Sequence, residues 1–538
     1  MKTKKNKLAI VGSCVLMLTV GFSQGLMAQA FVHPGCLETE ADFARMQTKV
    51  ILAGQSPWLD SYNILIANSH AQSTYVASPV AVLVRGTGNS ACSSENYSHA
   101  YNDAAAAYQL ALRWKISGDT TFANASVNIL NAWSGTCTNI CGDSNADLAA
   151  GLYGYEFACA AEIMRSYTGW SSADITKFQN FLKNVFYPVN HDFLVRHNNT
   201  CSSHYWANWD LCNMASILAT GVFCDDRTKY NEAITYFKSG IGTGNIDNTV
   251  PFLYNNGTLG QGQEEGRDQG HSGLDVALEG AFCQIAFNQG DDLFGYENNK
   301  VLALCEYFAD YNLGNTVPYT TYNNCENSDQ TVISSASRGD NRPAWDLIYN
   351  HYVNRMNVAA PFSTQYATRL RPEGGGGNYG STSGGFDQLG FTTLTSTIDK
   401  IPKANGTYRL QNRADGNYLD NLGVATNGAP AAQWQSSSSN NQKWVFTYNG
   451  GGYYKISCVT GGLYLDDLGH TANGSTVGQW ASSASFNQQW MIVPVGSYYK
   501  IVNRASGKCL DTGGLTANGS TMQQWGSGSS NNQQWSIQ

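Results

Sequence analysis

Two stretches of this chain place a dense group of polar side chains directly before an apolar pattern of helical period. The first, 203–212, packs a histidine, a tyrosine, two tryptophans, an asparagine and an aspartate into ten residues. The second, 260–271, is glycine-punctuated and rich in charge. The apolar positions at helical spacing are Leu211, Met214, Leu218 and Val222 after the first run, and Leu274, Leu278, Phe282 and Ile285 after the second. We therefore expect two helices with buried bodies, whose polar starts can face each other across one cleft.

The same helical period dominates the chain from residue 31 to about residue 397. Helices are predicted over 102–119, 122–133, 146–167, 174–186, 229–238, 299–311 and 344–356. They follow each other through short turns with almost no alternating strand pattern, which predicts antiparallel helical hairpins. At this length the hairpins favour a closed, all-α (α/α) toroid or barrel. The stretch 372–390 is rich in Gly and Ser and is expected to form a lid loop or an irregular tail.

A threefold repeat begins at residue 406, after a short linker at 398–405. Trp434, Trp480 and Trp525 are 46 and 45 residues apart, and a second tryptophan set repeats with the same spacings. Each unit runs from a tyrosine-rich strand through Leu-Asp and Gln-Trp to Asn-Gln-x-Trp. Three strand-rich units of this length predict an all-β β-trefoil over 406–538. The protein is thus expected to be multidomain, with the toroid over 31–397 preceding the trefoil.

The first 30 residues have the pattern of a signal peptide. Lysines at 2, 4, 5 and 7 precede an apolar run over 8–22, and Ala28-Gln29-Ala30 is a small-x-small cleavage site. No later segment has 18 or more consecutive apolar residues, so no membrane span is expected. We predict export, to the periplasm or the outside of the cell, after cleavage near Ala30.

Net charge and cysteine spacing limit the classes of ligand that the protein is expected to bind. Loss of the four lysines of the signal peptide would change the formal net charge from −8 to about −12, which argues against nucleic acid. Any anionic substrate must then be held by local positive charge. Of the 14 cysteines, Cys137 and Cys141 have the spacing of a short loop bridge, whereas no CxxC pairs with another to form a zinc site. We expect a monomer without metal or cofactor.

The two polar runs contain the groups that β-elimination of a uronic acid polymer requires. The C5 proton becomes acidic when the adjacent carboxylate is neutralised, and a base must then remove it. Asn208 is an amide donor, Arg267 a fixed cation, His271 a base that titrates near neutrality, and Tyr205 a phenol that can protonate the leaving oxygen. A simpler interpretation remains, in which Asn208 only caps its helix.

Other residues are assigned to substrate binding or to alternative chemistry. Arg338 and Arg342 could hold substrate carboxylates bidentately, or could form a loop salt bridge. The remaining substrate contacts are assigned to His204, Trp209, Glu265 and Asp268. A glycoside hydrolase using Glu264, Glu265 and Asp268 is the second hypothesis, although these carboxylates are bunched within five residues. A non-catalytic polysaccharide-binding protein is the third.

Five stretches, 203–212, 266–271, 288–293, 306–314 and 349–355, resemble the alginate lyase/glucuronan lyase superfamily. The resemblance implies a secreted toroidal lyase of glucuronan or mannuronate-rich alginate that leaves a 4,5-unsaturated uronate end. It places the catalytic asparagine in the pair Asn208-Trp209, with His271 and Arg267. Related lyases carry a tyrosine shortly after the histidine, which this chain lacks. Tyr205 is the first choice for that role, followed by Tyr307, Tyr349 and Tyr101.

The trefoil repeat resembles the ricin-type lectin module, and all three units keep both of its signatures. The resemblance implies a carbohydrate ligand, with an aspartate accepting sugar hydroxyls, a tryptophan stacking on the ring and an asparagine assisting. These residues are Asp420, Trp434 and Asn441, then Asp466, Trp480 and Asn487, then Asp511, Trp525 and Asn532. One or two pockets are expected to be purely structural, most of all the second, where Gly461-Gly462 replaces the turn found in the other units.

Overall fold

The computed structural model describes residues 30–538 except 328, 377–384, 400–402, 404 and 450–451. The predicted signal peptide therefore lies outside the described residues, apart from Ala30. None of the described helices is both long enough and apolar enough to cross a membrane.

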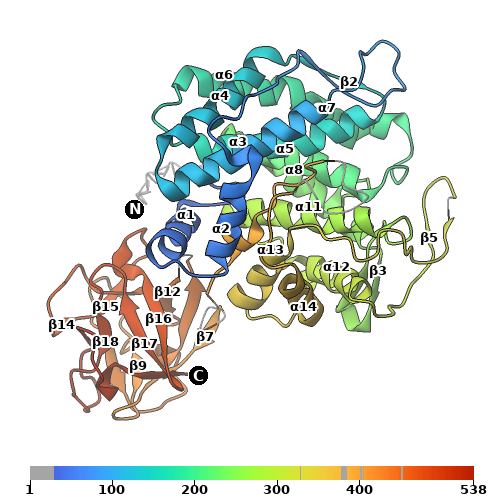
Figure 1. Cartoon of the computed structure of the whole chain (residues 1–538). Helices are drawn as coiled ribbons and strands as arrows, with labels where there is room; N and C mark the ends of the chain where they lie inside the picture. The colour runs from blue at the N-terminus through green and yellow to red at the C-terminus, as the bar shows by residue number, and fades with distance from the viewer. Residues whose placement is uncertain (1–29, 328, 377–384, 400–402, 404, 450–451) are drawn as a thin grey trace, which may run out of the picture. The chain divides into compact units, whose positions relative to one another are not determined.

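The N-terminal part of the chain is helical (Figure 1). Its longer helices are α1 Glu40–Met46, α2 Trp58–Ala67, α3 Ser98–Ser117, α4 Thr120–Thr136, α5 Asn145–Met164, α6 Ser172–Phe181, α7 Tyr187–Arg196, α8 Ala207–Phe223, α9 Arg227–Ser239, α11 Gln269–Asn288, α12 Tyr296–Asn312 and α14 Pro361–Leu370. The short helices are α10 Ile246–Thr249, α13 Trp345–Tyr349 and α15 Thr392–Ser396. All seven ranges predicted from the apolar pattern are helical, but in two of them the α-helix ends early, at Phe181 of α6 and Tyr349 of α13, and a π-helical stretch follows.

These helices close on themselves. Helix α3 packs against α4 and α5, α5 against α8, and α8 against α9 and α11. The last helix, α15, packs against α1, α2 and α13, which returns the end of the helical region to its beginning. This is the toroid predicted from the hairpins.

Short strands interrupt the helical pattern. They pair as β1 Val82–Arg85 with β2 Asn139–Gly142, β3 Phe252–Tyr254 with β4 Leu259–Gln261, and β5 Tyr322–Asn323 with β6 Asp329–Gln330. Strands of two to four residues carry too few alternating positions to be predicted from sequence.

The close contact between α5 and α8 fixes the helix that begins with the first polar run. A Cβ on Gly151 of α5 would lie 2.3 Å from Cys212 Sγ, and one on Gly154 would lie 2.2 Å from Ser216 Oγ. Only glycine lets the two backbones approach this closely. The body of α8 is buried from Leu211 to Phe223, as its apolar spacing predicted.

The C-terminal part is an antiparallel β-structure, drawn in orange to red in Figure 1. Its strands are β7 Gly406–Tyr408, β8 Leu410–Asn412, β9 Tyr418–Asp420, β10 Ala432–Trp434, β11 Trp444–Tyr448, β12 Tyr453–Cys458, β13 Tyr464–Asp466, β14 Ser475–Thr476, β15 Gly478–Trp480, β16 Trp490–Val495, β17 Tyr498–Asn503, β18 Cys509–Asp511, β19 Gln523–Trp525 and β20 Trp535–Ile537. The last strand of each repeat pairs with an early strand of the next, and β20 pairs with β8 to complete the cycle. This is the predicted β-trefoil.

The second tryptophan of each repeat forms the trefoil core. Trp444, Trp490 and Trp535 are completely buried. Their indole Nε1 atoms donate to Leu419 O, Leu465 O and Leu510 O at 3.0, 2.9 and 3.2 Å. The buried indoles therefore keep their one polar atom satisfied, which is why the position can repeat in an apolar core.

Candidate active site

The two polar runs meet at the start of α8. Ala207 N donates to Gln263 Oε1 at 3.0 Å, and Asn208 N donates to Glu264 Oε1 at 2.9 Å. The first turn of a helix has backbone N–H groups without partners and a positive end, so a carboxylate is stabilised there. Segment 260–268 thus caps α8 from outside, so the Asn208 side chain is not needed as the cap of its helix.

Glu264 joins the asparagine to the arginine. Its Oε1 also accepts from Asn208 Nδ2 at 2.5 Å, and its Oε2 accepts from Arg267 Nη1 at 2.8 Å. Glu264 is completely buried, whereas the Arg267 side chain is 26% exposed and lies over the Trp206 ring. One buried carboxylate therefore holds an amide and a guanidinium side by side with their other N–H groups unused by it.

His271 lies in the first turn of α11, next to the same arginine. Asp268 caps this helix: its Oδ1 accepts from His271 N at 2.9 Å, and its Oδ2 lies 2.7 Å from His271 Nδ1. Arg267 Nη2 lies 3.4 Å from His271 Nε2. A guanidinium has only donors, so this arrangement suits an acceptor at Nε2 and a proton on Nδ1 facing Asp268.

The acidic residues of the second run are engaged by protein groups. Burial works to raise the pKa of the Asp268 carboxyl, but the hydrogen bonds and charge of His271 outweigh it and leave that pKa below its ordinary value. Glu265 is completely buried and accepts from Gln269 Nε2 at 2.9 Å. Burial raises the pKa of Glu265 to about 8.

Tyr205 lies beside this cluster without a hydrogen bond to it in the described part of the chain. Asn198 Nδ2 lies 3.1 Å from the Tyr205 hydroxyl and donates to Asp147 Oδ2 at 2.6 Å. The Tyr205 ring lies 5.0 Å from the Trp209 ring. These rings form an aromatic wall next to the start of α8.

The other tyrosine candidates are placed differently. Tyr307 is completely buried and donates to Pro318 O at 2.7 Å. Tyr349 lies under the Arg371 guanidinium, at 5.1 Å. Tyr101 contacts the rings of Tyr97, Tyr153 and Phe386.

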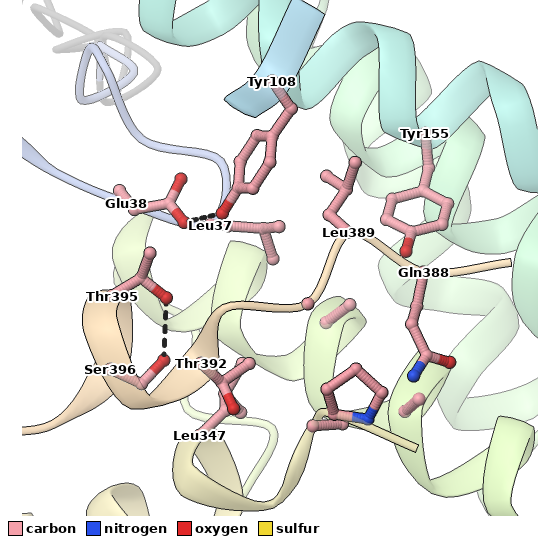
Figure 2. Close-up of a pocket in the computed structure, with 15 residues that line it drawn as sticks. Leu37, Glu38, Tyr108, Tyr155, Leu347, Gln388, Leu389, Thr392, Thr395 and Ser396 are labelled. Carbon is pink, nitrogen blue, oxygen red and sulfur yellow. Dashed lines mark hydrogen bonds between the residues drawn. The ribbon is translucent and has the colours of Figure 1, made fainter. Parts of the chain in front are cut away.

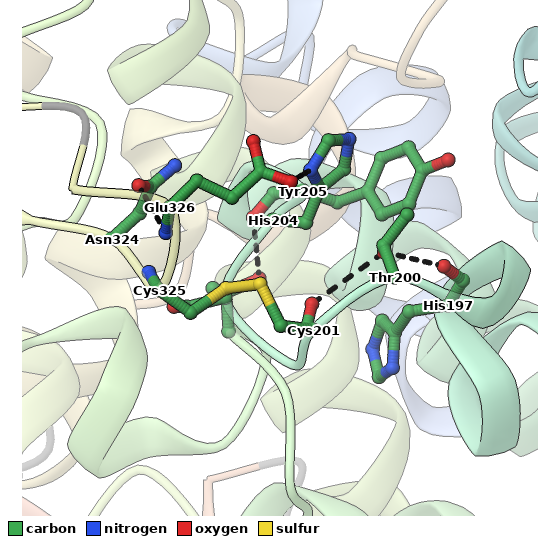
Figure 3. The surroundings of a disulfide bond; sticks show 10 residues. His197, Thr200, Cys201, His204, Tyr205, Asn324, Cys325 and Glu326 are labelled. Atoms are coloured by element: carbon green, nitrogen blue, oxygen red, sulfur yellow. Dashed lines mark hydrogen bonds and ion pairs between the residues drawn. A yellow bond between two sulfur atoms is a disulfide. The ribbon is translucent and has the colours of Figure 1, made fainter.

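Figure 3 shows the surroundings of His204, which lies just before the start of α8. The Cys201–Cys325 disulfide connects the segment before α8 to a distant loop, and Glu326 Oε1 of that loop lies 2.7 Å from His204 Nδ1. The second disulfide joins Cys92 to Cys141, so the expected Cys137–Cys141 bridge is wrong. Pairing of β2 with β1 brings Cys141 near Cys92, while Cys137 is a buried free thiol.

Arg338 and Arg342 donate hydrogen bonds to backbone carbonyl groups. The Arg338 guanidinium donates to Tyr311 O and Asn315 O. Arg342 is 3% exposed, donates to Gly270 O at 2.8 Å and pairs with Asp387 at 3.3 Å. Arg342 therefore supports the turn that precedes His271.

A further cation near α8 was not singled out in the sequence. Arg85 on β1 donates at 3.1 Å to Tyr153 Oη of α5, the helix that packs against α8, and lies over the Tyr97 ring. A single arginine in a four-residue strand carries no sequence signal that would mark it as part of a site.

A small cavity lies deeper in the helical domain (Figure 2). It is lined by residues of α3, α5, α11, α13 and α15, including Tyr108, Tyr155 and Leu347. Tyr108 Oη donates to Glu38, whose burial raises its pKa to about 8. In the described ranges, no group of three His, Cys, Asp or Glu side chains could hold a metal ion.

The three trefoil pockets share one geometry. Trp434, Trp480 and Trp525 are 42%, 45% and 44% exposed. Each aspartate is nearly buried and is oriented by a glutamine Nε2 that donates to its Oδ2, at 3.0, 3.0 and 2.9 Å; the pairs are Asp420 with Gln442, Asp466 with Gln488, and Asp511 with Gln533. The second pocket keeps this geometry despite Gly461-Gly462.

The three asparagines hold equivalent positions in three short helices. The backbone N–H groups of Asn441, Asn487 and Asn532 donate to the hydroxyls of Ser439, Ser485 and Ser530. In the first unit Asn441 Oδ1 also accepts from Thr460 Oγ1 at 2.8 Å.

Comparison with known families finds a match in each region. Residues 67–317 match the family model described as alginate lyase. Three overlapping stretches, 397–480, 440–525 and 486–538, match the model described as ricin-type beta-trefoil lectin domain-like. No curated protein matches the chain.

Solved structures resemble about a quarter of the chain. The designed threefold symmetric protein ThreeFoil is 36% identical over 25% of this chain and 98% of its own, with a TM-score of 0.24. An exo-beta-1,3-galactanase from Clostridium thermocellum is 34% identical over 27% of this chain and 32% of its own, with a TM-score of 0.24. A Macrolepiota procera ricin B-like lectin in complex with lactose is 22% identical over 25% of this chain and 96% of its own, with a TM-score of 0.22.

Proposed function

We propose that this chain, which combines an alginate lyase domain with a ricin-type β-trefoil lectin-like domain, is an exported polysaccharide lyase. Its substrate is a 1,4-linked uronic acid polymer, glucuronan or mannuronate-rich alginate. The observation that carries the proposal is the grouping of Asn208, Arg267 and His271 around the carboxylates of Glu264 and Asp268.

Asn208 and Arg267 neutralise the uronate carboxylate. Glu264 uses one amide N–H of Asn208 and one N–H of Arg267, which leaves further donors on both side chains for an incoming carboxylate. Charge-assisted hydrogen bonds from these donors strengthen as the C5 carbanion delocalises into the carboxylate. Because Glu264 fixes both groups beforehand, little reorganisation is needed at the moment of reaction.

His271 removes the C5 proton through Nε2. The C5–H bond breaks, the C4=C5 double bond forms, and the C4–O4 bond breaks with O4 leaving as a hydroxyl. Asp268 holds Nδ1–H and stabilises the imidazolium that results. We assign protonation of O4 to Tyr205, whose ring lies in the aromatic wall beside α8.

The trefoil binds carbohydrate and keeps the enzyme on its polymer. An exposed tryptophan face and an oriented aspartate in each repeat suit a sugar ring and its hydroxyls. We place the ligands at the three pockets around Asp420, Asp466 and Asp511.

The geometry does not favour a hydrolase. Glycoside hydrolysis needs two carboxyl groups on either side of the scissile bond, about 5–9.5 Å apart. Here Glu264 and Glu265 are completely buried, and Asp268 is bonded to His271.

The proposal is tested by incubating the purified protein with glucuronan, polymannuronate, polyguluronate and a chondroitin. We expect ultraviolet absorbance from a new C4=C5 double bond on glucuronan or polymannuronate. New reducing ends without that absorbance would contradict elimination.

A further inference from the structure

One disulfide joins the segment before α8 to a loop that lies 124 residues further along the chain (Figure 3). Its two residues, Cys201 and Cys325, are both exposed to solvent. The mechanism above gives this bond no role, although Cys201 lies shortly before Asn208 in the sequence. Its effect on the site depends on what the loop contacts.

The Cys325 loop, residues 317–327 and 329–336, rests on segment 261–269, which carries the glutamate and the arginine of the site. The side chain of Gln261 accepts from Thr320 N and donates to Thr320 O, both at 2.8 Å. Ser334 N donates to Glu265 O at 2.8 Å. The loop is therefore hydrogen-bonded to this segment on both sides of Glu264.

The closest approach of the Cys325 loop is at Gly266, the residue before Arg267. A Cβ on Gly266 would lie 2.4 Å from Tyr319 Oη and 2.6 Å from Gln330 Cβ. Tyr319 Oη also donates to Gln330 O at 2.9 Å, which ties the two arms of the loop together at this point. Only glycine permits so close a contact, so a shift of the loop would be felt directly by the backbone at Arg267.

Segment 261–269 also contacts the start of α8. Gln263 accepts from Ala207 N, and Glu264 accepts from Asn208 N and Nδ2. The start of α8, segment 261–269 and the Cys325 loop thus form a closed ring of contacts. The disulfide is the covalent link that closes this ring.

Two noncovalent contacts accompany the disulfide. Cys325 N donates to Ser203 Oγ at 2.8 Å, and Glu326 Oε1 lies 2.7 Å from His204 Nδ1. The side chains of His204 and Glu326 are 34% and 52% exposed, so solvent screens their attraction. The covalent bond is therefore the strongest tie between the loop and the segment before α8.

We propose that the Cys201–Cys325 disulfide is a positioning element for the elimination: it closes the ring that holds Glu264 and Arg267 against Asn208, so the lyase activity depends on the redox state of this exposed bond. This rests on the proposed function. With the bond broken, the Cys325 loop keeps only its hydrogen bonds, and segment 261–269 can move relative to α8. The amide and the guanidinium that neutralise the uronate are then less well preorganised.

A dithiol reductant supplies the chemistry that opens the ring. Its thiolate attacks one sulfur of the disulfide, the S–S bond breaks, and a mixed disulfide forms. The second thiol of the reductant then closes a cyclic disulfide and releases the protein. Two electrons and two protons pass from the dithiol to Cys201 and Cys325, which become thiols.

The second disulfide provides a matched control. Cys92–Cys141 is half-buried, and neither residue has a described hydrogen bond to segment 261–269. Cys201→Ser with Cys325→Ser opens the ring, whereas Cys92→Ser with Cys141→Ser removes a disulfide and leaves the ring closed. Both double variants should lose stability, because a disulfide restricts the unfolded chain. The assays therefore run well below the unfolding temperature of each protein.

The kinetic test measures kcat and KM with and without prior treatment with dithiothreitol, on the polymer that the wild type cleaves. We expect reduced wild type and Cys201→Ser/Cys325→Ser to share a kcat lowered about tenfold, with KM changed by less than about threefold. The reductant should not lower the rate of that variant further.

The control variant should behave in the opposite way. Cys92→Ser/Cys141→Ser should keep kcat within about twofold of the wild type and should still lose activity on reduction, since its Cys201–Cys325 bond is intact. Unchanged kcat in Cys201→Ser/Cys325→Ser, or equal losses in the two double variants, would overturn the proposal.

Hydrogen exchange gives a readout that does not need activity. We expect reduction to speed exchange at Asn208 N and Gln269 N, which donate to Glu264 and to Ala336 O, while helices α3 and α4 stay unchanged. Unchanged exchange after complete reduction would overturn the proposal about the disulfide and leave the lyase function standing. Faster exchange in a protein whose oxidised form gives no unsaturated product would instead contradict the function.

Discussion

The helical domain and the trefoil differ in how their proposed polysaccharide-binding groups are arranged. In the helical domain the proposed reactive groups occur once, and hydrogen bonds join them to carboxylates: Glu264 to Asn208 and Arg267, and Asp268 to His271. In the trefoil the binding groups occur three times and present open aromatic faces to solvent. Catalysis depends on a preorganised network that excludes alternatives, whereas retention on a polymer depends on several weak, independent contacts.

The largest expected difference between the two regions comes from removing the proposed catalytic groups. Asn208→Ala and His271→Ala should each lower kcat by about 10²–10⁴-fold, because they remove a transition-state donor or the base. Binding to insoluble polymer should be unchanged, since the trefoil pockets are untouched. Initial rates by ultraviolet absorbance and pull-down measure the two properties. Loss of binding in step with kcat would show that the regions do not divide the work as described.

The carboxylate that joins the cluster should matter less than the groups it holds. Glu264→Gln keeps the shape but loses the charge that accepts from Asn208 and Arg267. We expect kcat to fall by about 10–100-fold, within the range of a lost positioning contact. The control is Glu279→Gln, which should stay within about twofold because that buried group has no described hydrogen bond to the site. Equal losses in both variants would contradict the specific role of Glu264.

Single losses in the trefoil should be smaller still. Replacing Trp434, Trp480 or Trp525 with Ala removes one stacking face, at a cost of about 1 kcal/mol, or about fivefold in affinity. The triple variant should lose binding far more than any single one, because avidity is lost with it. The exposed Thr447 on β11, changed to Ala, is the control. Turnover of short oligouronates should not change in any of them.

The mildest effect concerns stability against pH. Burial raises the pKa of Glu38, Glu265 and Glu279 to about 8, from a usual value of 4.5. Between these values the folded chain binds more protons than the unfolded chain, so the free energy of unfolding should fall as pH rises from about 4.5 to 8. Thermal unfolding of the wild type and Glu279→Gln across this range measures it. The variant should show the shallower slope, and parallel curves would contradict the assignment.

The repeated region was the easier one to predict from sequence. Its threefold spacing of tryptophans and Leu-Asp pairs states the fold three times, and the buried Trp444, Trp490 and Trp535 follow directly from it. The helices of the toroid were also visible, because apolar residues recur at helical spacing along α8 and α11, which are buried on nearly every side. A sustained helical or repeat period can be recognised in the sequence alone, without knowledge of tertiary contacts.

The connections within the catalytic cluster were not visible. Asn208 and Glu264 are 56 residues apart, and their bond depends on how α8 packs against α11. Arg342 at a short loop could equally have met substrate, yet it supports Gly270 O. Cys137 has a suitable spacing to Cys141, but the pairing of β1 with β2 brings Cys92 to Cys141 instead. Local spacing limits which contacts are possible, and tertiary packing selects among them.

The most direct test of the central claim is the mass balance of one cleavage. A defined uronic acid tetrasaccharide, cleaved by the wild-type protein, should give two fragments whose masses sum to that of the substrate, one of them carrying a double bond. In the proposed elimination, no water is consumed when His271 removes the C5 proton and O4 leaves. Fragments whose masses sum to the substrate plus one water would show hydrolysis and contradict the account.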